Sequence, residues 1–367
     1  MRSVGPPPGQ SGGLSRTAVT HLYQQPGGPL WIATNGGLAR LASGSESWQN
    51  KSFAGTGNNS INVIAPGSGG VLWLGTGGGV IRYTPKNGAT RFFSHIPGDP
   101  HSLGPGANST LLEDRYGHLW VGGNEAGARG LDILDPASGS CSHYRHDAQD
   151  PSSLSSDIVN SIHRDGRGHI WLGTPAGLNR ATRAADGTIH FTRTAVTQPV
   201  SSINSDFAYN IWARTPGGLL RLDTQSGEIS SFATNEGAPD GTQIADQSFR
   251  SEDGTLYFGS LHGFSRVDPQ KIRQNTTAPQ VAITDISVFN RSLLKQPATD
   301  EAQLEGSVSD PQRLQLSWKA SVFTLELAAL HYADPVRNRL AYRLDGFDQN
   351  WVEVAAGQRT ATYTNLD

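Results

Sequence analysis

Apolar residues occur along this chain in short alternating runs, separated by clusters of Gly, Pro, Asp and Asn. Such runs predict short β-strands, because successive strand side chains point to opposite faces, and the clusters predict tight turns. Six runs align on one aromatic residue each, which we name the anchors: Trp31, Trp73, Trp120, Trp171, Trp212 and Tyr257. Successive anchors are 42, 47, 51, 41 and 45 residues apart. The chain is therefore expected to repeat one structural unit six times.

Each repeat unit predicts four strands in about 45 residues. An alternating segment precedes the anchor, with an Asp-x-x-Gly or Glu-Asp-Gly turn in the third, fourth and sixth units, and a second turn and a strand with an aromatic residue typically follow it. Five units also carry an arginine nine places after the anchor: Arg40, Arg82, Arg180, Arg221 and Arg266. A four-stranded unit at this period is the pattern of a β-propeller blade, whose faces are buried by stacking on neighbouring blades. We expect the anchors to fill the core between blades.

Composition agrees with an all-β fold and narrows the chemistry. The 44 glycines and 21 prolines disfavour a helical bundle. A formal net charge of −3 does not indicate the positive electrostatic potential that would attract the phosphates of a nucleic acid. A single cysteine, Cys141, excludes an intrachain disulfide, and no Cys/His cluster has zinc-ligand spacing. No apolar stretch reaches membrane-helix length, and residues 1–14 read as a flexible lead-in without a secretory signal.

At this point the repeats resemble a known family, the two-component regulator propeller. The shared pattern is an apolar residue, Trp, Gly-Thr and Gly-Leu-x-Arg, preceded by Asp-x-x-Gly. The linkers at 92–106 and 143–157 also place Asp-Pro-x-Ser-Leu after an aromatic and histidine strand, which is typical of that family. The closing Trp-Asp of WD repeats and the paired glycines of kelch repeats are missing from the sequence. The resemblance implies six recognisable blades over residues 15–274, and we favour an incomplete seven.

Residues 275–367 lose the propeller period and alternate as an antiparallel β unit. This part resembles the three-Y domain, which implies an immunoglobulin-like sandwich that is truncated here, after its linker. The positions that carry the resemblance are Tyr332, Tyr342, Leu344, Gly346, Phe347, Trp351 and Tyr363. In that family, propeller repeats followed by a three-Y domain form the periplasmic sensing region of hybrid two-component histidine kinases. We find no kinase boxes, receiver segment or membrane helix in this sequence.

Departures from the repeat are the candidate ligand-binding positions, because function is grafted onto the loops of a rigid scaffold. The third unit inserts residues after its anchor, which place Asn124, Glu125 and Arg129 in a loop where they could contact a sugar or an anionic oligosaccharide. Arg214 replaces the usual glycine in the fifth unit, and His262 is a further candidate in the sixth. The simpler alternatives are a tolerated insertion and a structurally paired arginine.

Catalytic and metal-binding motifs find little support. The glycines at 75–79 lack a following Lys-Ser/Thr, and no Asp-x-Asp-x-Asp-Gly calcium loop occurs. Glu113 and Asp114 lie in a turn, where neighbouring carboxylates need not face one pocket. The spacing of His143 and His146 leaves a metal site as an alternative to linker histidines. We expect no catalytic residue, no metal and no cofactor.

The principal hypothesis is a non-catalytic sensory region that recognises an extracellular oligosaccharide, within a periplasmic, homodimeric sensor anchored in the membrane by segments outside this sequence. Two alternatives stay open: a propeller enzyme of the streptogramin-lyase type and a scaffold propeller for protein contacts. A lyase should carry a catalytic histidine on the central channel and has no reason to carry a three-Y domain.

Overall fold

The computed structural model describes residues 18–25, 27–44, 48–53, 59–123, 130–232, 248–260, 263–272, 280–294, 299–330, 340–354 and 358–364. The chain divides into two compact units, Met1–Ile272 and Arg273–Asp367. Nearly all regular structure in the described ranges is β, with one short 3-10 helix, η1 (Ser68–Gly70). The all-β prediction is therefore confirmed.

The first unit contains six small antiparallel sheets in the described residues, which we number 1 to 6 in chain order. Their first strands are β1 (Val19–Gln24), β5 (Ile61–Pro66), β9 (Thr110–Glu113), β13 (Ser161–Arg164), β17 (Ser202–Ser205) and β21 (Ser248–Arg250). Their second strands, which carry the anchors, are β2 (Leu30–Thr34), β6 (Leu72–Thr76), β10 (Leu119–Gly122), β14 (Ile170–Thr174), β18 (Ile211–Thr215) and β22 (Leu256–Ser260).

The third strands are β3 (Gly37–Leu41), β7 (Gly79–Thr84), β11 (Leu131–Leu134), β15 (Gly177–Arg183), β19 (Gly218–Leu222) and β23 (Gly263–Val267). The fourth strands are β4 (Trp48–Lys51), β8 (Ala89–Ser94), β12 (Cys141–Tyr144), β16 (Ile189–Arg193) and β20 (Ile229–Phe232). Sheets 1 to 5 are four-stranded meanders, and sheet 6 has three strands among the described residues.

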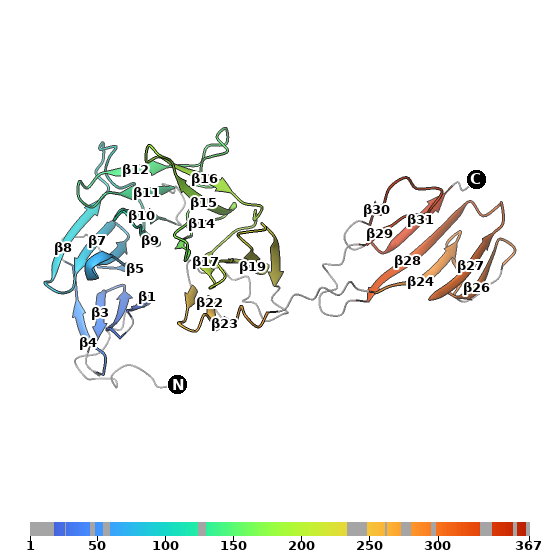
Figure 1. Cartoon of the computed structure of the whole chain (residues 1–367), viewed down its shortest axis with the longest axis horizontal. Coiled ribbons are helices and arrows are strands. Elements are labelled where there is room, and N and C mark those ends of the chain that lie inside the picture. The colour runs from blue at the N-terminus through green and yellow to red at the C-terminus, as the bar shows by residue number, and fades with distance from the viewer. Residues whose placement is uncertain are drawn as a thin grey trace. The chain divides into compact units, whose positions relative to one another are not determined.

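The sheets follow one another around a common centre. First strands of consecutive sheets contact each other in the order β1, β5, β9, β13, β17 and β21. Figure 1 shows these strands toward the middle of the first unit and the fourth strands β4, β8, β12 and β16 toward its outside. This radial order buries both faces of a sheet too small to form a core alone.

Each tryptophan anchor packs into the sheet that follows its own. Trp31 shares a buried cluster with Ile64 and Tyr83 of sheet 2, and its ring meets Tyr83 edge-on at 6.1 Å. Trp212 likewise shares a cluster with Leu256 and Phe258 of sheet 6. The other three tryptophan anchors lie in the corresponding clusters between sheets 2 and 3, 3 and 4, and 4 and 5: Trp73, Trp120 and Trp171.

Tyr257, the anchor of sheet 6, is different. Its ring is half-buried and lies near two exposed rings, those of Phe249 and Phe264. The reason is positional, because among the described residues no seventh sheet follows to cover it. The repeat arginines also have a common place, opposite the anchor on the third strand, as in the pairs Trp31–Arg40 and Trp171–Arg180.

Hairpins that begin with an aspartate hold the anchors by a hydrogen bond that recurs in three sheets; two of them have the Asp-x-x-Gly pattern, and that of sheet 5 has Tyr209 in place of the glycine. The indole Nε1 donates to an aspartate six residues earlier: Trp120 to Asp114 at 3.0 Å, Trp171 to Asp165 at 3.0 Å and Trp212 to Asp206 at 2.9 Å. Burial opposes ionisation of Asp165, but hydrogen bonds from Trp171 and His169 outweigh it and lower the pKa of that carboxyl. The hairpin therefore also fixes the anchor indole in the core.

The two linkers with Asp-Pro-x-Ser-Leu fold alike. His95 Nδ1 bonds the carbonyl of Leu103 at 2.9 Å, and His146 Nδ1 bonds the carbonyl of Leu154 at 2.7 Å. His143 is also engaged, with Asp132 at 2.6 Å. These histidines close their own loops or hold buried carboxylates, and no group of three metal-ligating side chains occurs in the described ranges.

The second unit also contains only β-structure in its described part. One sheet has the order β25-β24-β28-β31, and two hairpins pair β26 with β27 and β29 with β30. The strands are β24 (Gln280–Val288), β25 (Arg291–Ser292), β26 (Ala302–Ser307), β27 (Asp310–Leu316), β28 (Val322–Leu330), β29 (Ala341–Tyr342), β30 (Val352–Glu353) and β31 (Thr360–Thr364).

Several residues of the three-Y pattern come together in this unit. The Tyr363 ring stacks on Phe323 at 5.3 Å and meets Tyr342 and Phe347 edge-on. Its hydroxyl donates to Asp348 at 2.7 Å, and burial together with this carboxylate raises its pKa.

The remaining three-Y positions are less central or not described. Gly346 takes a positive φ of 89° in the turn that precedes β30. Trp351 is exposed and lies under Arg343, whereas Tyr332 is outside the described residues.

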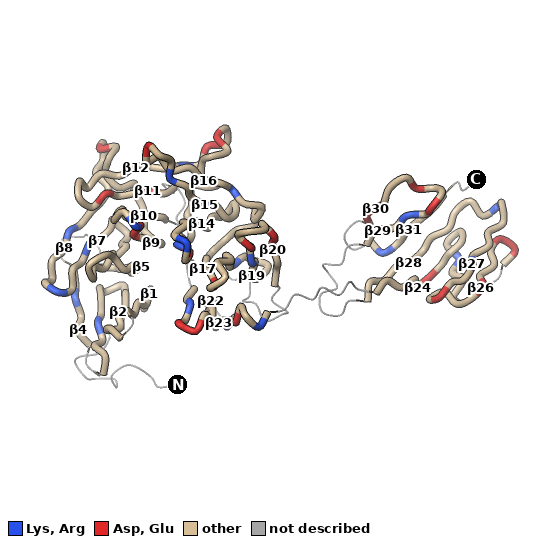
Figure 2. The backbone as a smooth tube through the Cα atoms, in the orientation of Figure 1, with Lys and Arg blue, Asp and Glu red and all other residues tan. Residues whose placement is uncertain are grey.

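Charge is distributed without a stripe of one sign. Figure 2 shows basic and acidic segments interspersed along both units. No helix in the described residues is long and apolar enough to cross a membrane.

Candidate functional site

A cavity of about 430 Å³ lies at the hairpin edge between sheets 3 and 4. Its walls are the β9–β10 hairpin, the β13–β14 hairpin and the β15–β16 hairpin. We name it the arginine cavity, because its lining includes Arg115, Arg164, Arg167, Arg180 and Arg183. Asp114 is the one carboxylate in the lining, and Tyr116, Trp120 and His169 complete its aromatic part. The volume is in the range of small-molecule pockets.

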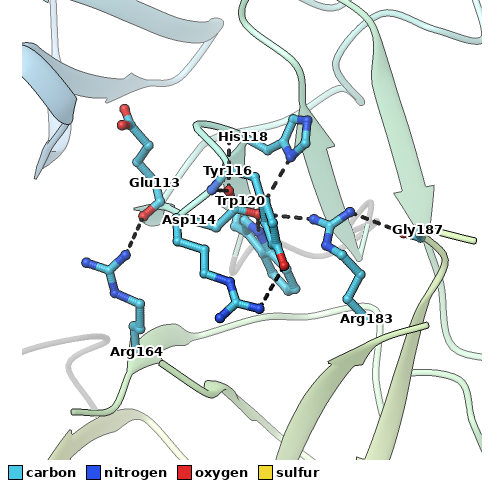
Figure 3. A network of polar contacts seen from close by, with 9 residues as sticks. Glu113, Asp114, Tyr116, His118, Trp120, Arg164, Arg183 and Gly187 are labelled. Carbon is cyan, nitrogen blue, oxygen red and sulfur yellow. Dashed lines mark hydrogen bonds and ion pairs between the residues drawn. The ribbon is translucent and has the colours of Figure 1, made fainter. Parts of the chain in front are cut away.

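Asp114 is the structural centre of this cavity (Figure 3). Its buried carboxylate accepts hydrogen bonds from the backbone N–H groups of Tyr116 and His118, at 2.8 and 3.0 Å, and from the Trp120 indole. The Arg183 guanidinium reaches it from the β15–β16 hairpin at 3.1 Å and also donates to the Gly187 carbonyl. Arg183 thus ties sheet 4 to the hairpin of sheet 3.

The other guanidinium groups are held by weaker contacts. Arg115 lies over the Tyr116 ring at 4.9 Å and donates to its hydroxyl at 2.7 Å. Arg164 reaches the Glu113 carbonyl at 3.5 Å, and Arg167 lies over the Tyr209 ring at 4.5 Å. Stacking on a ring leaves the N–H edge of a guanidinium open to an oxyanion.

Glu113, the neighbour of Asp114, faces away to another sheet. Its carboxylate accepts hydrogen bonds from the Trp73 indole and from the backbone of Ser68. The two adjacent carboxylates therefore serve different inter-sheet contacts and do not form a catalytic pair.

A second cavity, of about 1190 Å³, lies between sheet 1 and sheet 6. We name it the open-edge cavity. Its lining comes from β1 and the following turn on one side and from β21, its hairpin and β22 on the other. Large apolar side chains are exposed here on both sides, including Leu22 and Phe249, which are 57% and 63% exposed.

The predicted ligand-binding residues are only partly placed by the structure. Asn124, Glu125, Arg129 and His262 are outside the described residues. Arg214 is in β18 and is 1% exposed, so its side chain is enclosed within the first unit. It lines neither the arginine cavity nor the open-edge cavity. Ligand contact by these five residues stays a prediction.

The arginines at the β9–β10 and β13–β14 hairpins were missed by sequence reasoning, which looked for departures from the repeat at another turn. A signal was present in the sequence. Four residues before the anchor, Arg167 stands where sheets 3 and 5 have Tyr116 and Ala208. Twelve residues after the anchor, Arg183 stands where sheet 5 has Thr224.

A half-buried histidine lies beside this region on β13. His163 bonds the Ser205 hydroxyl at 2.9 Å, and burial lowers its pKa to about 4, aided by Arg250 and Arg164 and opposed by Asp165. Burial also lowers the pKa of His21 on β1 to about 4. Both imidazoles are therefore neutral at physiological pH.

His163 predicts a pH-dependent stability. An unfolded histidine has a pKa of about 6.5. As the pH falls below that value, the unfolded chain binds a proton that folded His163 does not, so stability decreases down to about pH 4. The loss from this group is at most about 3 kcal/mol. Urea unfolding from pH 7.5 to 4.5 should show a shallower decline for His163→Gln than for the parent chain. His190→Gln, at an exposed position of β16, should keep the parent's slope.

Comparison with protein families finds a two-component regulator propeller repeat at residues 153–176. This segment includes the linker before sheet 4, β13, β14 and the anchor Trp171. Histidine kinase P4 of Formosa agariphila is 24% identical over 132 residues, which is 36% of this chain and 10% of that protein.

Solved structures share the fold. One, described as the extracellular domain of a hybrid two component system from B. thetaiotaomicron, matches with a TM-score of 0.61 at 20% identity. The match covers 96% of this chain and 52% of that one, so this chain spans about half its length. Virginiamycin B lyase from Staphylococcus aureus matches with a TM-score of 0.51 at 16% identity, covering 70% of this chain and 83% of the lyase.

The fold is thus shared by the extracellular domain of a hybrid two component system and by an enzyme, and the matching repeat is that of the two-component regulator propeller. This chain is an all-β protein that carries a two-component regulator propeller repeat and resembles, in fold, the extracellular domains of hybrid two-component systems.

Proposed function

We propose that this chain is the sensory, ligand-recognition region of a two-component sensor, that its ligand is an extracellular oligosaccharide, and that the chain itself catalyses no reaction. The observation that carries the proposal is the arginine cavity, which joins ring surfaces and many hydrogen-bond donors on a propeller-like scaffold. Convergent polar groups in a concave site fix the orientation of a bound ligand and give the site its specificity.

Residues 15–274 form the propeller in this proposal, and residues 275–367 form a linker and part of an immunoglobulin-like three-Y domain. The packing of Tyr342 and Phe347 against the Tyr363 ring, whose hydroxyl donates to Asp348, supports the second assignment. The region would lie in the periplasm as part of a homodimer. Ligand binding would then change the arrangement of two protomers, because a ligand shifts an equilibrium only by its differential affinity for two states.

We also infer that the six blades are an incomplete ring of seven. Sheets 1 and 6 face the open-edge cavity with exposed apolar side chains, whereas the faces between consecutive sheets are filled by anchors. A seventh four-stranded sheet of the same repeat is the occupant that would cover Tyr257 and the outer face of β1.

The open edge predicts uneven protection of the backbone. Amide protons of β1 and β21 should exchange with solvent at least about tenfold faster than those of β9 and β13, because on one side of each of these two strands no described sheet covers it. Hydrogen–deuterium exchange followed by mass spectrometry measures this. Equal protection of all four strands would contradict an open ring.

The oligosaccharide proposal is tested with the purified chain on a glycan array, followed by calorimetry on the sugars retained. We expect saturable binding of at least one oligosaccharide class with a one-to-one stoichiometry and no change in the sugar. Absence of binding to every class, or conversion of a bound compound by the chain, would overturn the proposal. A lyase assay on a streptogramin is the specific test for the enzymatic alternative.

A further inference from the structure

We propose that the arginine cavity binds an oxyanion group, a sulfate ester or a carboxylate, carried by the ligand. This inference rests on the proposed function, because it names the chemistry of the oligosaccharide that the sensory region would recognise. It places the recognition at the hairpin edge of sheets 3 and 4 and not on the five residues that the sequence predicted.

Charge is the first argument. The lining contains five arginines and one aspartate, and Asp114 is already engaged by Arg183, the Trp120 indole and two backbone N–H groups. Among the described residues, no carboxylate pairs with the other four guanidinium groups. Gathering like charges at one edge raises the free energy of the folded chain unless an anion compensates them.

The second argument is that the propeller-like scaffold does not require Arg164 and Arg167. Arg180 belongs to the repeat and lies over its anchor Trp171, so we assign it to the scaffold. By contrast, the corresponding hairpin of sheet 5 has Ser205 in place of Arg164 and Ala208 in place of Arg167. The hairpin of sheet 5 still holds its anchor through Asp206. Arg164 and Arg167 are therefore not required by the hairpin.

The third argument is the state of the donors. Arg183 is a positioning residue, since both ends of its guanidinium are occupied by Asp114 and Gly187. Arg164 and Arg167 are exposed. Arg164 makes one long hydrogen bond to the Glu113 carbonyl, and Arg167 stacks on the Tyr209 ring. In the view of Figure 3, Arg164 and Arg183 lie on opposite sides of Asp114 and Trp120. A planar guanidinium group whose N–H donors are not paired with a carboxylate suits bidentate binding of a sulfate or carboxylate.

The experiment is calorimetry on the full chain with four disaccharides: a sulfated one, its unsulfated counterpart, a uronic acid disaccharide and the corresponding neutral one. We expect at least one charged member to bind about tenfold tighter or more than its neutral counterpart, with affinity falling as salt is raised. Tighter binding of the sulfated disaccharide would indicate a sulfate ester as the ligand group, and tighter binding of the uronic acid disaccharide would indicate a carboxylate.

Three variants localise the effect. Arg164→Gln and Arg167→Gln should each weaken binding of the charged sugar by about tenfold or more, without lowering the melting temperature. Arg91→Gln is the matched control, since Arg91 also lies over a ring, that of Phe93, and donates to a carbonyl, but is outside the cavity. It should bind as the parent does.

The outcomes separate the two proposals. If neutral and charged sugars bind equally and the two variants bind as the parent does, the oxyanion inference is wrong and the sensory proposal stands. If free sulfate binds as tightly as the sulfated sugar, the oxyanion site stands and sugar recognition fails. If none of the four disaccharides and no free sulfate binds, the oxyanion inference is overturned, and the glycan array alone decides the sensory proposal.

Discussion

Trp212→Ala is expected to destabilise the first unit by about 3–5 kcal/mol, the usual cost of deleting a large buried aromatic side chain. Trp212 is fully buried, stacks on Phe232 at 5.4 Å and donates its indole hydrogen to Asp206. Urea unfolding followed by circular dichroism should show an earlier transition for this unit.

Two variants make that result specific. Trp212→Phe keeps a ring but loses the hydrogen bond to Asp206, so it should cost less than the alanine variant. Phe249→Ala removes a ring that is 63% exposed and should change the midpoint little. A Trp212→Ala variant as stable as Phe249→Ala would show that the anchors do not hold consecutive sheets together.

Gly177→Ala is the second large effect that we expect, at about 2–5 kcal/mol. Gly177 begins β15 with a φ of 119°, where an L side chain is strained by about 1–2 kcal/mol. Its added Cβ would also overlap the Val196 carbonyl and lie 3.1 Å from the Thr197 Cα, which adds about 1–3 kcal/mol of overpacking. The same unfolding experiment measures the loss.

Gly187→Ala separates the two causes. Gly187 has a φ of 90°, yet nothing lies within 4 Å of a Cβ built there. This variant should lose only the conformational part, about 1–2 kcal/mol. Equal losses for Gly177→Ala and Gly187→Ala would mean that the contact with Val196 relaxes without cost.

The sheets were predictable because their signals are local. The anchors, the glycine at or just before the start of each third strand and the hairpin before each anchor recur once in every unit, and each acts within one hairpin. The same glycine position takes a positive φ in all six sheets: Gly37, Gly79, Gly130, Gly177, Gly218 and Gly263. Local geometry of this kind is set by the chain within a few residues.

The candidate site was not predictable in this way. Arg183 and Asp114 are 69 residues apart, and Arg164 reaches the carbonyl of Glu113 across 51 residues. A pairing of that kind depends on which hairpin of one sheet lies beside which hairpin of the next. The predicted ligand-binding residues included residues of the loop after Trp120 but neither Arg167 nor Arg183, although these two arginines also depart from the repeat.

By itself, the sequence determined the all-β class, the repeat and the aromatic anchors, because strand period and turn chemistry are written in neighbouring residues. The tertiary structure alone decided that each tryptophan anchor packs on the following sheet, that among the described residues no sheet covers Tyr257, and that arginines of neighbouring hairpins line one cavity. These features depend on radial stacking, which brings together side chains that no spacing along the chain relates.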